Sequence, residues 1–172
     1  AVGTPNAATT GEWTRGDPIG TAAQPESDAT PEPGTDGWFT GQGTIGGSLG
    51  QADVDGGRTT LVSPLLDVAG AQSASIRFAR WYSNSAGGSP GADVFEIDLS
   101  DDGGASWVTA DVVGPSGAGT SGGWIESELD VASFVALTDR VRIRFIASDL
   151  GNGSIVEAAI DDVVVSVVDP PG

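Results

Sequence analysis

The chain has 172 residues and a formal net charge of -17, which suits one domain with a sizeable core and argues against nucleic acid or anionic membranes as partners. It contains no Cys, His, Met or Lys, so disulfides, imidazole bases, Schiff-base lysines and the usual zinc ligands are excluded. The 24 acidic side chains instead indicate that a hard cation, calcium above all, stabilises the fold.

The two ends of the chain, residues 1–10 and 169–172, are small and polar and have no regular period. We expect them to be linkers on either side of a single domain at 11–168. Such flanks are typical of a module of a larger secreted protein whose signal peptide has been removed. No apolar run approaches the roughly 18 residues of a membrane helix, so we expect no membrane insertion.

Short segments rich in Val, Ile, Phe and aromatic residues recur along the chain, separated by clusters of Gly, Pro, Ser and Asn. They predict strands at 12–15, 37–40, 59–66, 73–82, 93–100, 105–113, 124–131, 140–148 and 155–168. In 140–148 the apolar residues alternate with Arg142 and Arg144, which indicates one buried and one wet face. The pattern predicts an all-β fold, an antiparallel β-sandwich with jelly-roll topology.

Two stretches depart from this strand pattern. Residues 16–58 are rich in proline and acidic side chains and hold few core-sized residues, although 37–40 predicts a strand within them. A connection of this length in a compact domain is functional or disordered, and we expect an ordered loop pinned by a cation. Residues 130–139 predict a short helix with Asp130 as its N-cap.

The spacing of Ser100, Asp102, Gly104 and Trp107 matches the Asp-box S-x-D-x-G-x-x-W, which resembles the repeated boxes of sialidases. It predicts a hairpin turn in which Asp102 caps backbone N–H groups, Gly104 takes a positive φ and Trp107 packs in the core. A sialidase also needs an arginine triad, a tyrosine nucleophile and several blades. The chain has one box and one tyrosine, so we interpret the box as a structural turn.

Candidate calcium ligands occur in the acidic stretch, in the DVDGG segment and on the last strand. Calcium takes about six to eight oxygens at roughly 2.3 to 2.6 Å, and carboxylates and carbonyls supply them together. The candidates are Asp17, Glu26, Asp28, Asp53, Asp55, Asp161 and Asp162. Alternate residues of an extended segment point the same way, so Asp53 and Asp55 are suited to one ion. The alternative is that all these carboxylates are ordinary solvated side chains.

Three stretches together resemble a known family. They are GEWTRGDPIGTAAQPESDATPEPGTDGWFTGQG, DVDGGRTTLVSPLLDV and GSIVEAAIDDVVV. They are similar to the MAM-like jelly-roll accessory modules of secreted bacterial peptidases and other exported enzymes, a group that includes gingipain-type adhesin and choice-of-anchor-like domains. The resemblance covers 11–168. It implies a non-catalytic, extracellular module, beside a parent enzyme domain in the same chain, that serves adhesion or substrate targeting. It also implies calcium between the first loop and the last strand, with Asp161 rather than Asp162 as the ligand.

The aromatic residues support an alternative function. Five Trp in one domain allow a carbohydrate-binding module that stacks a polysaccharide or cell-surface glycan on exposed rings. The candidate contacts are Trp81, Tyr82 and Trp124, with Arg80 on the sugar hydroxyls. The opposing interpretation places the tryptophans in the core and pairs the arginines with acids. A carboxylate-based glycosidase, with two carboxyls about 5 to 10 Å apart, is a remote alternative, and we do not expect an enzyme.

Overall fold

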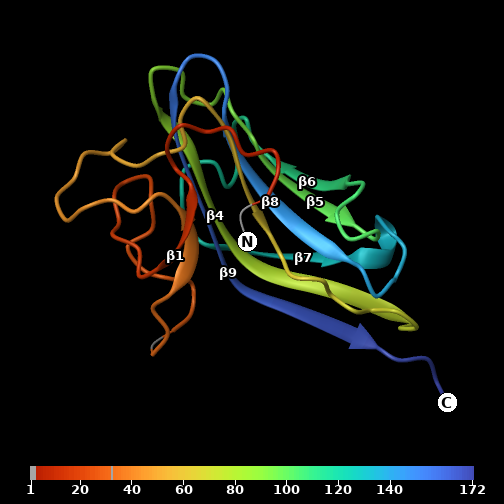
Figure 1. Ribbon diagram of the computed structural model, residues 1–172. Helices are drawn as coiled ribbons and strands as arrows, with labels where there is room; N and C mark the ends of the chain where they lie inside the picture. Colours follow the sequence, from red (N-terminus) through yellow and green to blue (C-terminus); the bar gives the residue numbers. More distant parts are fainter. Residues whose placement is uncertain (1–2, 32) are drawn as a thin grey trace.

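The computed structural model describes residues 3–31 and 33–172, and nearly all of its regular structure is antiparallel β (Figure 1). The described strands are β1 (Trp13–Gly16), β2 (Gly37–Thr40), β3 (Gly57–Val62), β4 (Ser73–Gly87), β5 (Phe95–Ser100), β6 (Val108–Val113), β7 (Ile125–Asp130), β8 (Arg142–Asp149) and β9 (Ser154–Val168). Each overlaps a segment whose apolar pattern predicted a strand, and β4 extends five residues beyond the predicted end at 82.

Two sheets pack face to face. One has five strands in the order β1-β2-β9-β4-β7, and the other has four in the order β3-β8-β5-β6. Neighbours in both sheets are antiparallel, and strands from both halves of the chain interleave in each. This arrangement confirms the predicted jelly-roll sandwich. The two longest strands, β4 and β9, pair with each other along most of their length and form the middle of the larger sheet.

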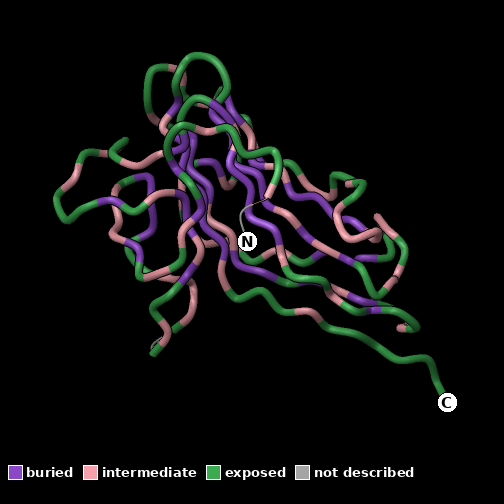
Figure 2. Tube along the Cα trace, in the orientation of Figure 1, coloured by how far each residue is buried: buried purple, intermediate pink, exposed green. Residues whose placement is uncertain are grey.

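The core lies between the sheets, where Figure 2 shows the buried stretches of the strands. Alternation along β8 sends Ile143 and Phe145 inward, while Arg142 and Arg144 are only half-buried, as predicted. Aromatic rings join the sheets: Phe78 meets Phe145 edge to face at 5.1 Å between centroids. Burial of these apolar faces fixes the strand register, because a slip by one residue would expose them.

Two sequence-based predictions about elements were wrong. The predicted helix at 130–139 is a single 3-10 turn, η1 (Val131–Ser133), and Asp130 makes no side-chain capping hydrogen bond. Burial of Val131 in the core holds this segment as a connection between β7 and β8. The strand predicted to reach residue 66 ends at Val62, before Pro64, which has no N–H for a ladder. No helix of the described residues is long and apolar enough to cross a membrane.

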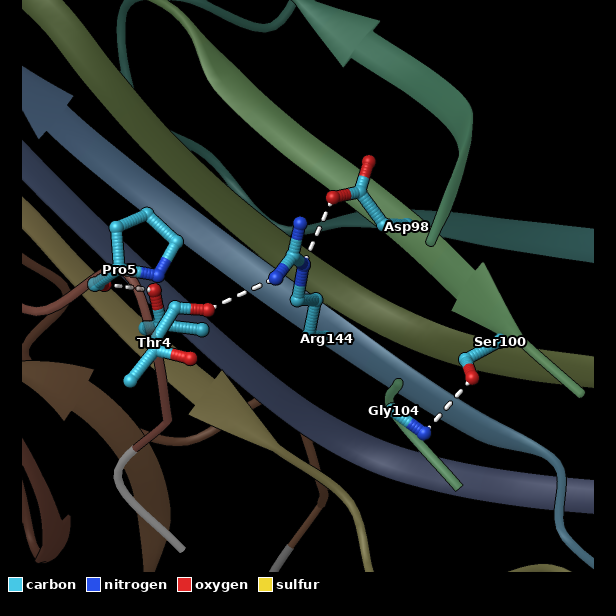
Figure 3. Close-up of polar contacts among 7 residues, drawn as sticks. Thr4, Pro5, Asp98, Ser100, Gly104 and Arg144 are labelled. Atoms are coloured by element: carbon cyan, nitrogen blue, oxygen red, sulfur yellow. Dashed lines mark hydrogen bonds and ion pairs between the residues drawn. The ribbon is translucent and has the colours of Figure 1, made fainter. Parts of the chain in front are cut away.

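The N-terminal segment is not a free linker. Residues 1–2 of the predicted linker lie outside the described residues, whereas 3–10 run beside β3. The amides of Gly3 and Ala7 donate to β3 carbonyls at 2.8 Å each. The Arg144 guanidinium also donates to the Thr4 carbonyl at 2.8 Å (Figure 3). This segment therefore covers an edge that would otherwise expose unpaired backbone groups.

The Asp-box forms the predicted turn. Asp102 accepts hydrogen bonds from the Ser106 hydroxyl at 2.6 Å and from the amides of Ser106 and Ala105 at 2.9 and 2.8 Å. The Ser106 hydroxyl first, and then these amides, hold the pKa of the Asp102 carboxyl well below its usual range. Gly104 has a φ of 96°, and its amide donates to the Ser100 hydroxyl at 2.8 Å (Figure 3). The side-chain bonds of Ser100, Asp102 and Ser106 close the turn on itself, and Asp101 accepts the Ala136 amide at 2.9 Å from the connection to β8, so the box has a structural role.

The position of Trp107 corrects one prediction about the box. Its ring lies outside the core and is half-exposed, with the Arg144 guanidinium 4.3 Å from the ring centroid. Arg144 also pairs with the buried Asp98 at 2.8 Å (Figure 3). The ring therefore covers a largely buried ion pair on the outer face of the four-stranded sheet, where a cation–π contact replaces core packing.

Candidate functional site

An acidic loop, residues 17–36, connects β1 to β2 and packs beside the larger sheet. In Figure 1 it forms the red-to-orange lobe on the side of the molecule where β1 lies. Two tryptophans hold it: Trp81 of β4 donates its indole N–H to the Ala23 carbonyl at 2.6 Å, and Trp124 donates to the Ser27 carbonyl at 3.1 Å. Their rings meet edge to face at 6.0 Å. Both predicted sugar-contacting tryptophans thus anchor the acidic loop.

The acidic loop is also bound to the last strand. Asp161 of β9 accepts a hydrogen bond from the Ala29 amide at 3.0 Å, and the neighbouring Asp162 accepts one from the Thr30 hydroxyl at 2.8 Å. Asp162 has a φ of 50°, a left-handed conformation that Asp tolerates better than most residues. The first loop and the last strand therefore meet, and direct hydrogen bonds join them.

The structure divides the remaining predicted ligands between two places. Asp17, Glu26 and Asp28 line a pocket of about 360 Å³ in the acidic loop, where the Glu26 carboxylate accepts the Gly20 amide at 2.8 Å. Asp53 and Asp55 lie elsewhere, on either side of a residue that bridges to β9. Within 3–31 and 33–172, no three acidic side chains are grouped so as to hold one ion.

The carboxylate with the most unusual surroundings is Glu157, which the sequence analysis overlooked. It lies on β9 and is 2% exposed. Its Oε2 accepts hydrogen bonds from the Thr40 hydroxyl at 2.8 Å and from the Gln24 amide at 3.3 Å. A charged residue inside the otherwise apolar run SIVEAAI was the available signal, because Glu is almost never fully buried without a partner.

Three oxygens converge on the side-chain nitrogen of Gln24, which is 2% exposed. The nitrogen lies 2.7 Å from the Thr40 carbonyl, 2.6 Å from the Gly41 carbonyl and 3.3 Å from the Glu157 carboxylate. A primary amide has two hydrogens to donate, so the oxygens outnumber them. We call Gln24, Thr40, Gly41, Asp53 and Glu157 the junction site, because they come from the first loop, the end of β2, the DVDGG segment and the last strand.

The junction site disfavours negative charge unless a cation is present. The pKa of Glu157 is raised to about 8, mainly by burial and also by the charge of Asp53, while the hydrogen bonds from Thr40 and Gln24 oppose this rise. Burial also raises the pKa of Asp53 to about 6, with the charge of Asp55 adding to the effect. Carboxylate and carbonyl oxygens gathered in this way are the ligands that calcium prefers.

Two predicted sugar contacts are placed away from the tryptophan pair. Tyr82 is 1% exposed and stacks on Phe95 at 5.5 Å, so its ring belongs to the core and cannot lie against a surface ligand. Arg80 and Trp81 are successive residues of β4, so their side chains point to opposite faces of the sheet. The Arg80 Nε donates to the Ser127 hydroxyl at 3.1 Å. Burial lowers the pKa of Arg80. Neither residue shares a surface with Trp81 and Trp124.

Comparisons with known proteins show the fold but no family. No protein-family model and no curated protein matches the sequence. A chain from a study of promiscuous specificity in carbohydrate-binding modules of the β-sandwich superfamily aligns at 12% identity and a TM-score of 0.52, over 93% of this chain and 55% of that one. A cyclase from Fischerella sp. TAU aligns at 12% identity and a TM-score of 0.51, over 99% of this chain and 81% of the cyclase chain.

A third solved structure is similar over nearly its whole length. The K1 cleaved adhesin domain of Lys-gingipain from Porphyromonas gingivalis W83 aligns at 13% identity and a TM-score of 0.48, covering 96% of each chain. Identities this low show a common architecture rather than a common activity, since one fold hosts many functions.

Proposed function

We propose that the chain is a calcium-stabilised, non-catalytic β-sandwich module of a secreted protein, MAM-like, which serves adhesion or substrate targeting beside a parent enzyme domain. The observation that carries this proposal is the convergence of three oxygens on Gln24 Nε2, next to the buried carboxyl of Glu157. A bound calcium ion would replace the amide nitrogen at this point, and the Gln24 side chain would present its oxygen to the ion instead.

The arrangement of the carboxyls favours a structural role. A glycosidase needs two carboxyl groups that face an open cleft on either side of a glycosidic bond. Glu157, the acid with the most strongly raised pKa, is 2% exposed and enclosed by the acidic loop and β2. A sugar ring has no path to it while the loop stays in place, so the buried carboxyl suits a ligand no larger than an ion.

Calcium titration of the chelator-treated chain tests this proposal. Calorimetry should show calcium binding, and the melting temperature should rise by roughly 5 to 10 °C at 100 times the Kd, since binding to the native state adds about 2.7 kcal/mol. The variant E157Q keeps the size of the side chain but removes its charge, and it should lose this binding. The matched control is E26Q in the acidic-loop pocket, which should keep it. Equal calcium affinity in E157Q and the native chain would refute the assignment of the site.

Carbohydrate binding is the second candidate function, and the Trp81–Trp124 pair favours it. Both rings are half-buried rather than enclosed, so part of each remains available at the surface of the larger sheet. A solved β-sandwich chain from work on carbohydrate-binding modules has the same architecture. Affinity electrophoresis on a panel of polysaccharides should show retention that W124A abolishes and W38A, in a separate cleft, preserves. A panel without any retention would remove this candidate.

A further inference from the structure

Two carboxylates lie next to each other at one end of the smaller sheet, Asp93 just before β5 and Asp149 at the end of β8. Phe95 of β5 pairs with Ala147 of β8, and the same register continued by two residues brings Asp93 opposite Asp149. Because side chains two apart share a face, both carboxylates point into the sandwich, as Phe95 and Ala147 do. Asp93 is 4% exposed and Asp149 is 2% exposed. Like charges directly opposite each other in a sheet are destabilising, so this pair needs a physical explanation.

Each carboxylate uses one oxygen and leaves the other without a hydrogen bond. Asp93 Oδ1 accepts the Leu150 amide at 2.7 Å, and Asp149 Oδ1 accepts the Ser154 amide at 3.4 Å. The Oδ2 atoms of both residues are buried, and no donor among the described residues bonds to them. The hydroxyl of Tyr82 is likewise buried without a hydrogen-bond partner among the described residues. Asn84, two residues after Tyr82 on β4, donates its side-chain amide to the Asp93 carbonyl at 2.6 Å, which brings this part of β4 against Asp93. The charges of Asp93 and Asp149 both raise the pKa of Tyr82, after burial.

No arginine of the described residues neutralises this pair. None of the ion pairs found among the described residues involves Asp93 or Asp149. Burial is the main cause that raises the pKa of Asp149 to about 6; the Ser154 amide opposes it, while the charges of Asp93 and Asp55 and a side-chain hydrogen bond with Asp93 add to it. When both carboxyls ionise, no protein cation of the described residues balances their charge, in a part of the molecule where a bare charge is strongly disfavoured.

Two loops close over the pair and fix its position. Figure 1 shows the loop after β4 and the loop between β8 and β9 side by side at one end of the sandwich. The Gly88 amide donates to the Gly153 carbonyl at 3.0 Å, and the Ser154 hydroxyl donates to the Ser89 carbonyl at 2.7 Å. Asn84 adds a bond from its amide to the Asp93 carbonyl at 2.6 Å. The free oxygens are thus held by a frame that does not depend on them.

We propose that Asp93, Asp149 and Tyr82 hold a second hard cation, calcium by charge and ligand type, independently of the junction site. A divalent ion balances the two carboxylates and gives a partner to both free Oδ2 atoms, and the tyrosine hydroxyl serves as a neutral oxygen ligand. Carboxylate and hydroxyl oxygens are ligands of the kind that calcium prefers, and water completes the oxygen shell.

Calcium binding in the E157Q background tests this second site, because that variant removes the junction site. Equilibrium dialysis with calcium should show that E157Q retains one ion and that the double variant E157Q/D149N retains none. The chelator should lower the melting temperature of E157Q and leave that of the double variant unchanged. The control variant E157Q/D139N changes an exposed acid and should behave as E157Q does.

The single variant D149N adds a test of sign. In chelator it should melt above the native chain, because the substitution removes a repulsive charge, and in calcium it should melt below it, because a ligand is lost. The proposal is overturned if E157Q binds no calcium at millimolar concentration, or if D149N melts above the native chain in both conditions. The second outcome would mean that the two carboxyls share a proton instead. D149N keeps the junction site, so a D149N chain that binds no calcium would refute the junction site. An E157Q chain that binds none would refute the second site, so the two proposals fail separately.

Discussion

Removal of calcium should make the stability of this domain strongly dependent on pH, and Glu157 should be the main cause. Its pKa rises from 4.5 to about 8 in the folded, calcium-free chain. Below pH 4.5 the carboxyl is protonated in both the folded and the unfolded chain. Between pH 4.5 and 8 the folded chain holds a proton that the unfolded chain has lost, so the free energy of unfolding falls as the pH rises.

The size of the loss follows from the change in pKa. A tenfold change in proton affinity corresponds to about 1.4 kcal/mol, so ionising Glu157 inside the fold costs on the order of 5 kcal/mol by pH 8. For a domain of this length, roughly 2 to 4 °C of melting temperature correspond to each kcal/mol, which gives a fall of roughly 10 to 20 °C. Calcium should cancel most of this loss, because the ion stabilises the ionised carboxylate.

Differential scanning calorimetry at pH 5, 7 and 8.5, in calcium and in chelator, measures the effect. The melting temperatures of the native chain in calcium and in chelator should move apart as the pH rises. In chelator, E157Q should melt at nearly the same temperature at pH 7 and 8.5. Asp53 also has a raised pKa, of about 6, so its contribution to the loss of stability is complete before pH 8. Parallel curves for the native chain in calcium and chelator across this range would refute the reasoning.

Three further predictions concern the frame around the sites. D98N should lower the free energy of unfolding by about 3 kcal/mol in urea denaturation, because it leaves the Arg144 charge largely buried without its partner. D102A should lower the melting temperature by opening the Asp-box turn, whereas the exposed control D139N should not. W81F removes a 2.6 Å hydrogen bond to the acidic loop, so hydrogen exchange there should quicken while the core stays protected, at a cost of about 1 kcal/mol.

Alternation of apolar and polar residues was sufficient to predict most strands. In β8 the half-buried arginines and the buried Ile143 and Phe145 specify one face for the core, and the same pattern placed β4, β5 and β9. The Asp-box turn was predictable because its hydrogen bonds are local. The N-terminal segment was not, because it is attached to β3 mainly through backbone groups, which leave no signal in the side chains.

The sites were harder to predict because they combine residues far apart in the chain. The acidic loop and the last strand were expected to meet, and they do, through Asp161 and Asp162. Glu157 was missed because it lies in an apolar run whose neighbours suggested only core. Asp93 and Asp149 become a pair solely through the β5–β8 register, which pattern reasoning does not determine.

The most direct test of the account is the position of the metal in a crystal of the chain grown with calcium. Anomalous difference density should lie about 2.3 to 2.6 Å from the Glu157 carboxylate and the Gly41 carbonyl, with the Gln24 side chain turned so that its oxygen faces the ion. Density confined to the acidic-loop pocket, with Gln24 Nε2 still donating to Glu157, would contradict the central claim.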